Sequence, residues 1–117
     1  NRDEINQAIV DIEKFEADLK DAKLGLDLDL ENAKTQINNS IITLNAQKEN
    51  VRLAKEVLTN VENNYKNGLA NLTDLLDSET SYADAQNNYT NALLYYKLAE
   101  VKLIKAKGEL KTLTNNN

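Results

Sequence analysis

The sequence predicts an all-α fold, a long antiparallel helical hairpin whose helices resemble those of a coiled coil. Apolar residues recur at intervals of three and four along most of the chain, which is the period of a helix. With no proline and only 3 glycines, little in the chain interrupts a helix. One strong stop signal divides the periodic stretches. We therefore expect a single hairpin over residues 1–117, with helices at about 2–66 and 72–113 and a tip turn at 67–71.

Composition excludes several classes of function. A hydrophobic content of 41% and an aromatic content of 5% are low for a compact globule. The net charge of −5 argues against nucleic acid or an anionic membrane surface as a partner, because both need clustered Lys and Arg. No apolar run approaches the roughly 20 residues that span a bilayer. The chain has no Cys and no His, and therefore no thiol nucleophile and neither the commonest general base nor the commonest metal ligand. We expect no enzyme activity, cofactor or metal site.

The first periodic stretch carries an apolar seam whose intervals alternate between three and four, as the a and d positions of a coiled coil do. Its members are Ile5, Ala8, Ile12, Phe15, Leu19, Ala22 and Leu26. Two four-residue stutters are expected next, at Leu26–Leu30 and Ile37–Ile41, where a left-handed supercoil would locally unwind. The seam then resumes at Leu44, crosses polar Lys48 and continues to Tyr65.

Residues 24–30 alternate apolar and polar side chains with period two, which is a strand pattern. We still predict helix, because the stretch joins two long helical patterns and a lone glycine such as Gly25 costs only about 1 kcal/mol there. As a helix this stretch is apolar most of the way round, so we expect it to pack against more than one neighbour.

The stop signal is the run Tyr-Lys-Asn-Gly at 65–68. Gly68 suits the left-handed position just past a helix end, and Lys66 places positive charge at the negative end of the helix dipole. Asn71 can then cap the second helix, with Asp74 three residues later in the arrangement of a capping box. The second helix reads, at helical spacing, Leu72, Leu76, Ala83, Gln86, Tyr89, Leu93, Tyr96, Leu103, Ala106, Leu110 and Leu113.

Pairing the helices back from a turn near Leu69 places Leu113 opposite roughly Gly25, so the first helix overhangs by about six turns. This overhang carries the apolar seam of residues 5–22 without a cover. A stripe of this kind is typical of a surface that packs against other chains or segments. We predict an assembly component that self-associates through residues 5–22 when isolated. Because helical periodicity begins at once, with no visible signal peptide, we also expect a fragment of a longer protein.

Residues 65–80, Tyr-Lys-Asn-Gly-Leu-Ala-Asn-Leu-Thr-Asp-Leu-Leu-Asp-Ser-Glu-Thr, resemble the signature of the TolC family of outer-membrane efflux proteins. In that signature a glycine follows a tyrosine by three residues, and a Leu/Asp/Leu-Leu-Asp run comes next. Segments 85–89, 95–99 and 106–110 are also similar. The specific part of the resemblance spans Tyr65–Leu110, and the first helix is compatible with the family's long helix after the second pair of barrel strands.

The resemblance implies a homotrimeric transport protein. Each TolC-like protomer gives four β-strands to an outer-membrane barrel and two helical hairpins to a periplasmic α-barrel tunnel. The chain is expected to be the second hairpin, in the periplasm of a Gram-negative cell, with another short helix covering the overhang. Hairpin tips form a gated entrance that contacts the periplasmic adaptor protein of an inner-membrane pump, in drug efflux or type I secretion.

Tip residues carry the expected roles in the gate. Tyr65 matches a tyrosine whose hydrogen bonds help to hold the entrance closed, although an ordinary packing role for this side chain stays open. Gly68 matches the turn glycine, and Leu69 completes the expected gate. Adaptor contact is expected at Asn67, Gly68 and Leu69. A basic residue of the TolC closing contacts is replaced by Ala70, so a closed state here would need other contacts.

Asp74 and Asp77 match lumen-facing aspartates that form acidic rings around the threefold axis of TolC. Their spacing of three puts both carboxylates on one helix face. The plainer alternative is that they favour the positive N-terminal end of the helix dipole, which needs no channel.

A different class of function stays open as the alternative: a coiled-coil hairpin that serves as an interaction module, such as a pump adaptor or a tether. Adaptor hairpins lack the pattern of Tyr65, Gly68, Asp74 and Asp77 and normally sit between the halves of a lipoyl-like domain. The tip pattern therefore favours the channel.

Overall fold

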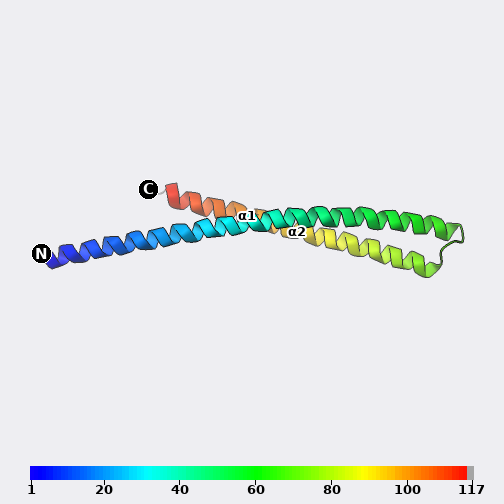
Figure 1. Ribbon diagram of the computed structural model, residues 1–117, viewed down its shortest axis with the longest axis horizontal. Helices are drawn as coiled ribbons and strands as arrows, with labels where there is room; N and C mark the ends of the chain where they lie inside the picture. Colours follow the sequence, from blue (N-terminus) through cyan, green and yellow to red (C-terminus); the bar gives the residue numbers. More distant parts are fainter. Residues whose placement is uncertain (116–117) are drawn as a thin grey trace. The chain divides into compact units, whose positions relative to one another are not determined.

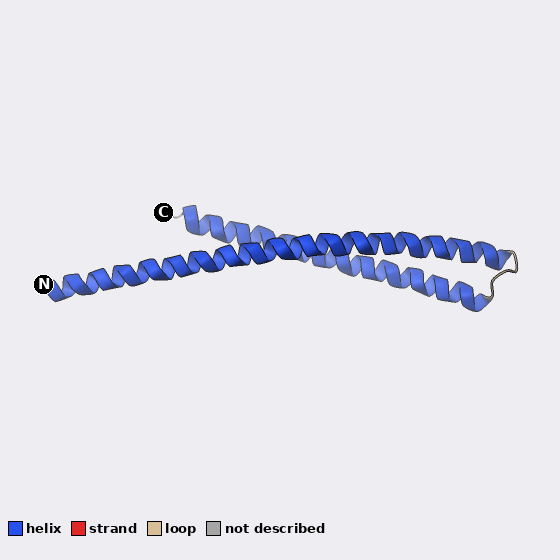
Figure 2. Cartoon of the chain, in the orientation of Figure 1, coloured by secondary structure: helices blue, strands red, loops and turns tan. Residues whose placement is uncertain are grey.

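The computed structural model describes residues 1–115, which form two α-helices, α1 (Arg2–Lys66) and α2 (Leu72–Asn115), joined by a short turn (Figure 1). Residues 116–117, the last of the expected hairpin, lie outside this description. The described part contains helices and no strand, so the all-α prediction is confirmed (Figure 2). The alternating stretch 24–30 is helical, and α2 continues two residues past the predicted end at Leu113.

The chain divides into two compact units, and each helix contributes a segment to both. The first unit contains residues 1–35 together with α2 from Val101 onward, and the second contains Gln36–Glu100. The second unit is by itself an antiparallel helical hairpin, because it includes the turn and the two helical arms on either side of it.

Within the second unit, α2 buries small side chains at every seventh position. These are Ser78, Ala85, Ala92 and Ala99, each at most 9% exposed. A larger, half-buried side chain precedes each of them by three residues in the sequence. These are Leu75, Tyr82, Tyr89 and Tyr96. The two sets form the a and d positions of an uninterrupted heptad repeat. Small residues at one of these positions let two helix backbones approach closely.

The facing stripe of α1 keeps the same strict alternation, so the predicted stutter at Ile37–Ile41 is wrong. Ser40 is half-buried while Ile41 is exposed, and Gln47 rather than Lys48 lies in the seam. The physical reason is geometric. Once α2 presents a strict heptad, only residues spaced 3.5 apart on average can face it, and position on the helix outweighs the polarity of an individual side chain.

Large residues face small ones across this seam when the helices are paired back from Gly68. Leu44 comes opposite Ala92, and the polar Gln47 comes opposite Tyr89. The alternation repeats along the unit, with the larger α1 residues Ile37, Leu44, Val51 and Leu58 at the levels of Ala99, Ala92, Ala85 and Ser78. Each layer therefore keeps a similar volume, which is what close packing requires.

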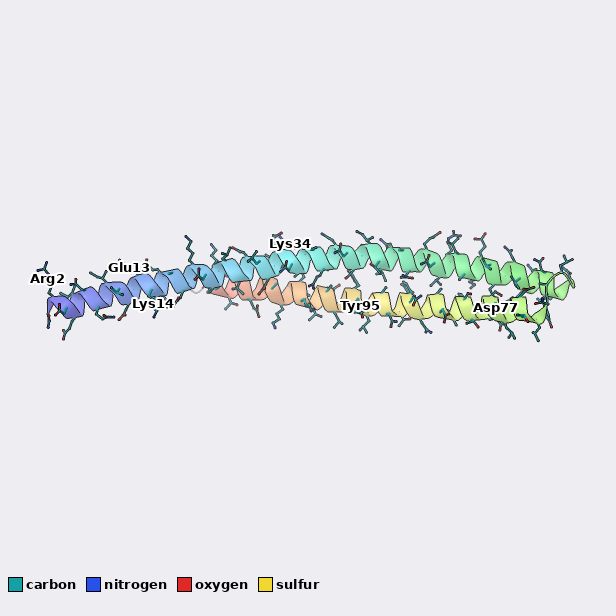
Figure 3. All side chains as sticks on the ribbon, turned by 60° about the horizontal axis from the view of Figure 1, so that its bottom comes forward. Arg2, Glu13, Lys14, Lys34, Asp77 and Tyr95 are labelled. Atoms are coloured by element: carbon teal, nitrogen blue, oxygen red, sulfur yellow. The ribbon has the colours of Figure 1, made fainter. Side chains whose placement is uncertain are left out.

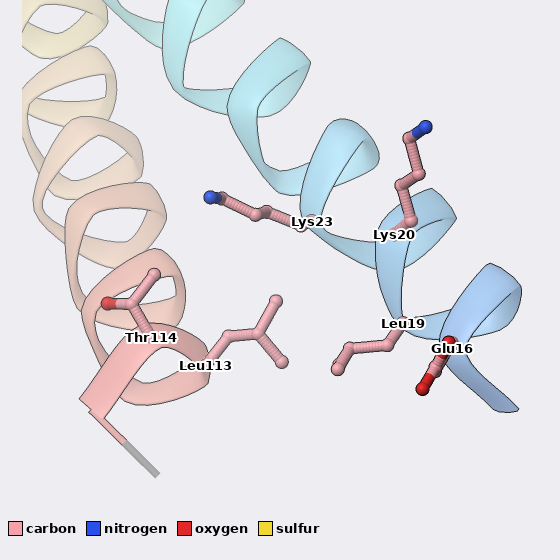
Figure 4. A pocket seen from close by; sticks show the side chains of 6 residues that line it. All are labelled: Glu16, Leu19, Lys20, Lys23, Leu113 and Thr114. Carbon is pink, nitrogen blue, oxygen red and sulfur yellow. The ribbon is translucent and has the colours of Figure 1, made fainter. Parts of the chain in front are cut away.

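In the first unit, residues 2–35 of α1 and the last part of α2 pack through Ala33 and Ala106, which are both buried. Leu113 shares an open hollow with Leu19 and Lys23 (Figure 4) and a second one with Leu26. Ala22 and Lys23 are both exposed, so the predicted stutter at Leu26–Leu30 stays a prediction.

The start of α1 carries the predicted uncovered stripe. Ile12 is 57% and Phe15 is 67% exposed, and no described residue covers them. The charged side chains of Arg2, Glu13 and Lys14 extend from the same stretch (Figure 3). Because Leu113 lies beside Leu19, the uncovered stretch is about one turn shorter than the sequence predicts.

Candidate functional site

The tip turn begins with a hydrogen-bonded helix end at Gly68. The Gly68 N–H donates to the Tyr65 carbonyl at 3.1 Å, and the Leu69 N–H donates to the Asn64 carbonyl at 2.7 Å. This pair of bonds is the Schellman motif, which satisfies carbonyls that the end of a helix leaves free. Gly68 has a φ of 74°, so the predicted left-handed glycine is confirmed.

The second helix begins with a reciprocal capping box, also as predicted. The Asp74 N–H donates to Asn71 Oδ1 at 2.8 Å, and the Asn71 N–H donates to Asp74 Oδ2 at 3.1 Å. Asp74 therefore stabilises the start of α2, as the plainer alternative requires. Its Oδ1 atom takes no part in the capping box.

Apolar side chains are exposed around the turn. Leu69 is 78% exposed and Tyr65 is 42% exposed. Leu72 and Leu76, in the first two turns of α2, are also exposed. Lys66 and Asn67 lie between these apolar groups along the chain and are exposed as well. The tip thus presents a mixed surface, which is typical of a site that binds another protein.

Both aspartates line one shallow groove where α2 begins. This groove, about 450 Å³, is open to solvent, and its apolar residues come from the end of α1 and from the turn. Its lining residues are Val57, Val61, Asn64, Leu69, Ala70, Asp74, Asp77, Ser78 and Ser81. Figure 3 shows Asp77 on α2 close to the turn. The groove therefore joins the acidic pair to Leu69 and Ala70, whereas Tyr65 does not line it.

Sequence reasoning missed the α1 side of this groove, which is formed by Val57, Val61 and Asn64. The heptad repeat places Val61 in the seam, but only the register between the two helices brings it beside the aspartates. Asn67 lies in the turn and Tyr65 at the end of α1, and both are outside the groove lining.

A cluster of three charged side chains lies on α1, away from the tip, and is exposed to solvent. Arg52 bonds Glu49 at 2.6 Å through Nη2 and Glu56 at 3.1 Å through Nη1, all within α1. The hydrogen bond from Arg52 lowers the pKa of the Glu49 carboxyl, and the same contact raises the pKa of Arg52. All three side chains are more than half exposed, so the cluster contributes little stability.

The described residues contain no group of three or more Asp or Glu side chains placed to hold a metal ion. Within residues 1–115, neither helix has a segment long and apolar enough to cross a membrane. What the helices do present is a heptad seam, an uncovered apolar stripe and an exposed tip. These features are typical of a helical component of a larger assembly.

The sequence profile described as "Outer membrane efflux protein" matches residues 1–109, and the chain belongs to this family. The expected resemblance is thereby confirmed. Family members are outer-membrane transport channels that work as trimers with adaptors in efflux pumps, and the family is not an enzymatic one. No curated protein and no solved structure matches the chain.

Proposed function

We propose that this chain is a wall segment of the periplasmic tunnel of a trimeric outer-membrane export channel, and that its tip is part of the gated entrance. The segment lies in the periplasm of a Gram-negative cell. The observation that carries the proposal is the tip itself, where the family pattern from Tyr65 to Asp77 coincides with an exposed turn and an acid-lined groove.

The helical architecture supports a tunnel wall. A wall helix must contact neighbours on more than one side, so apolar residues should remain exposed after the hairpin seam is filled. The helices keep such residues. Leu24 and Leu28 on α1 and Leu94 and Leu98 on α2 lie outside the seam, and each is about half exposed.

The acidic pair fits a ring at the entrance. In a trimer, Asp74 and Asp77 would form two adjacent rings of three carboxylates, whose field attracts cations and repels anions. The capping role of Asp74 does not compete with this, because the capping box uses Oδ2 and leaves Oδ1 available.

Single-channel recording of the full-length trimer tests the rings. Asp74→Asn combined with Asp77→Asn should reduce cation selectivity and block by divalent cations. The asparagine at 74 can still accept the capping hydrogen bond, so the fold is preserved. Glu79→Gln, an exposed acid of α2 that does not line the groove, serves as the matched control and should leave selectivity close to the parent. Unchanged selectivity in the double variant would contradict the ring.

Adaptor docking is proposed at Asn67, Gly68 and Leu69, and gating at Tyr65, Gly68 and Leu69. Leu69 has the most exposed apolar side chain of this set, so its burial in an adaptor contact should contribute most to the binding free energy. Leu69→Ser in the full-length channel should weaken adaptor binding about tenfold, or 1.4 kcal/mol. Leu94→Ser removes an exposed leucine from the middle of α2 and is the control. Equal adaptor affinity of the two variants, measured by biolayer interferometry, would rule out docking at the turn.

The alternative function is a coiled-coil interaction module, such as an adaptor or tether. Membership of the outer membrane efflux family argues against it, and the docking experiment separates the two. A module that is itself the adaptor would bind a channel tip and would not bind an adaptor.

A further inference from the structure

The dipeptide Asn67–Gly68 has a chemistry that no other asparagine of this chain shares, because it is the single asparagine followed by glycine in the sequence. In such a pair the backbone nitrogen of the second residue can attack the side-chain amide of the first. Glycine has no Cβ to hinder that approach, and asparagine is among the residues most prone to this reaction.

We propose that Asn67 is a spontaneous deamidation site built into the tip turn, and that its reaction rearranges the end of α1. Deamidation is a reaction of the chain with water and does not depend on the channel role. In the first step the Gly68 nitrogen forms a bond to Asn67 Cγ and loses its hydrogen, and the side-chain amide leaves as ammonia. The product is a five-membered succinimide. Water then opens either carbonyl of the ring, which gives aspartate or isoaspartate at position 67.

The turn makes Asn67 accessible in a way that most other asparagines are not. Asn67 lies just past the end of α1 and is exposed, and a Cβ added at Gly68 would meet nothing within 4 Å. Asparagines inside the helices, such as Asn63 and Asn88, are followed by residues with side chains whose backbone nitrogens lie within a continuous helix. Such a nitrogen cannot reach the side-chain amide without local unwinding.

One hydrogen bond restrains the reaction. The Gly68 N–H donates to the Tyr65 carbonyl at 3.1 Å, and this bond must open before the nitrogen can attack. An exposed backbone hydrogen bond contributes only about 1 kcal/mol, so the last turn opens readily. The reaction rate therefore reports how often the Schellman motif opens.

The products are incompatible with the turn as it stands. Aspartate at 67 adds a negative charge beside the carbonyl end of α1, where the helix dipole disfavours it. Isoaspartate also inserts a methylene group into the backbone between Asn64 and Leu69, which displaces the Leu69 N–H from its 2.7 Å bond to the Asn64 carbonyl. Isoaspartate therefore moves Leu69, whose side chain is 78% exposed.

Peptide mapping by mass spectrometry tests the site on the whole chain. The folded protein is incubated in mildly alkaline buffer at physiological temperature, and deamidation is followed as a gain of about 1 Da per site. We expect the peptide containing Asn67 to react at least about tenfold faster than peptides containing Asn71 or Asn88, and methyltransferase labelling to detect isoaspartate in it. Asn71 is the nearest control, since it is also exposed and lies outside both helices, but it precedes leucine and its Oδ1 accepts the capping hydrogen bond.

Two variants keep the assignment falsifiable. Asn67→Gln should abolish the fast phase, because attack on the longer side chain would need a six-membered ring, whereas Asn60→Gln, inside α1, should leave it unchanged. A fast phase that survives in Asn67→Gln, or a rate at Asn67 no higher than at Asn71, overturns the proposal. Neither result bears on the channel function, which the recordings above test separately.

Discussion

Gly68 is the position at which one residue type is required by the backbone. All three glycines have open space where a Cβ would lie, and only Gly68 has a positive φ, 74°. Gly25 and Gly108 lie inside helices, where glycine is a poor helix former. The same substitution should therefore have opposite effects at the tip and in the helices.

Thermal and urea unfolding of alanine variants measures this contrast. Gly68→Ala should destabilise the chain by about 1–2 kcal/mol, because a side chain is penalised in the left-handed region. Gly25→Ala and Gly108→Ala should instead stabilise it by roughly 0.5–1 kcal/mol through helix propensity. A stabilising effect at all three positions would show that the tip turn does not hold its left-handed conformation in solution.

Residue-level signals at the turn were readable from the sequence because they are local. The left-handed Gly68 and the capping box of Asn71 and Asp74 depend on residues at most a few positions apart, and both are confirmed. The groove that joins Asp77 to Val57 was not readable in this way, since it requires the register between two helices.

At the scale of the helices, a residue's position on the helix, more than its polarity, decides whether it lies in the seam. Sequence reasoning followed apolar side chains and so selected Ile41 and Lys48, whereas the structure half-buries Ser40 and Gln47. The clearer signal was in α2, where small residues recur every seventh position from Ser78 to Ala106. That repeat fixes which stripe of α1 can face it.

Because facing residues of this seam share a layer, volume added on one helix should be offset by volume removed on the other. Ala92→Leu adds volume where the side chain is 4% exposed, and should destabilise the hairpin by about 1–3 kcal/mol. Leu44→Ala removes volume from the layer opposite, so the double variant should recover part of the loss. Asn91→Leu, on the exposed neighbouring position, is the control and should cost little. Strictly additive effects of Ala92→Leu and Leu44→Ala on the free energy of unfolding would show that the two residues do not share a layer.

At the scale of the whole molecule, the uncovered stripe at the start of α1 implies association. It carries exposed Ile5, Ile9, Ile12 and Phe15 within the first unit. In the proposed channel, a neighbouring segment or chain would cover these residues. No described residue of the isolated chain packs on this stripe. A second copy of the chain is therefore expected to cover it.

Sedimentation velocity over a range of concentrations tests this association. The parent chain should form a concentration-dependent oligomer, and Ile12→Ser combined with Phe15→Ser should shift it to the monomer while helicity stays constant. Ile42→Ser combined with Leu94→Ser removes two comparably exposed apolar side chains from the second unit and should leave association intact. A fully helical parent that sediments as a monomer at every concentration would contradict the role of the stripe.

The sequence by itself determined that the chain is helical, where α1 ends and α2 begins, and that an apolar stripe at the start of α1 is left uncovered. It could do so because capping, breaker residues and helical period are properties of neighbours along the chain. Tertiary structure alone decided which stripe of α1 faces α2 and which residues share a groove with Asp74 and Asp77. Those facts depend on the register between two helices, and register is set by the complementary volumes of layers that lie far apart in the sequence.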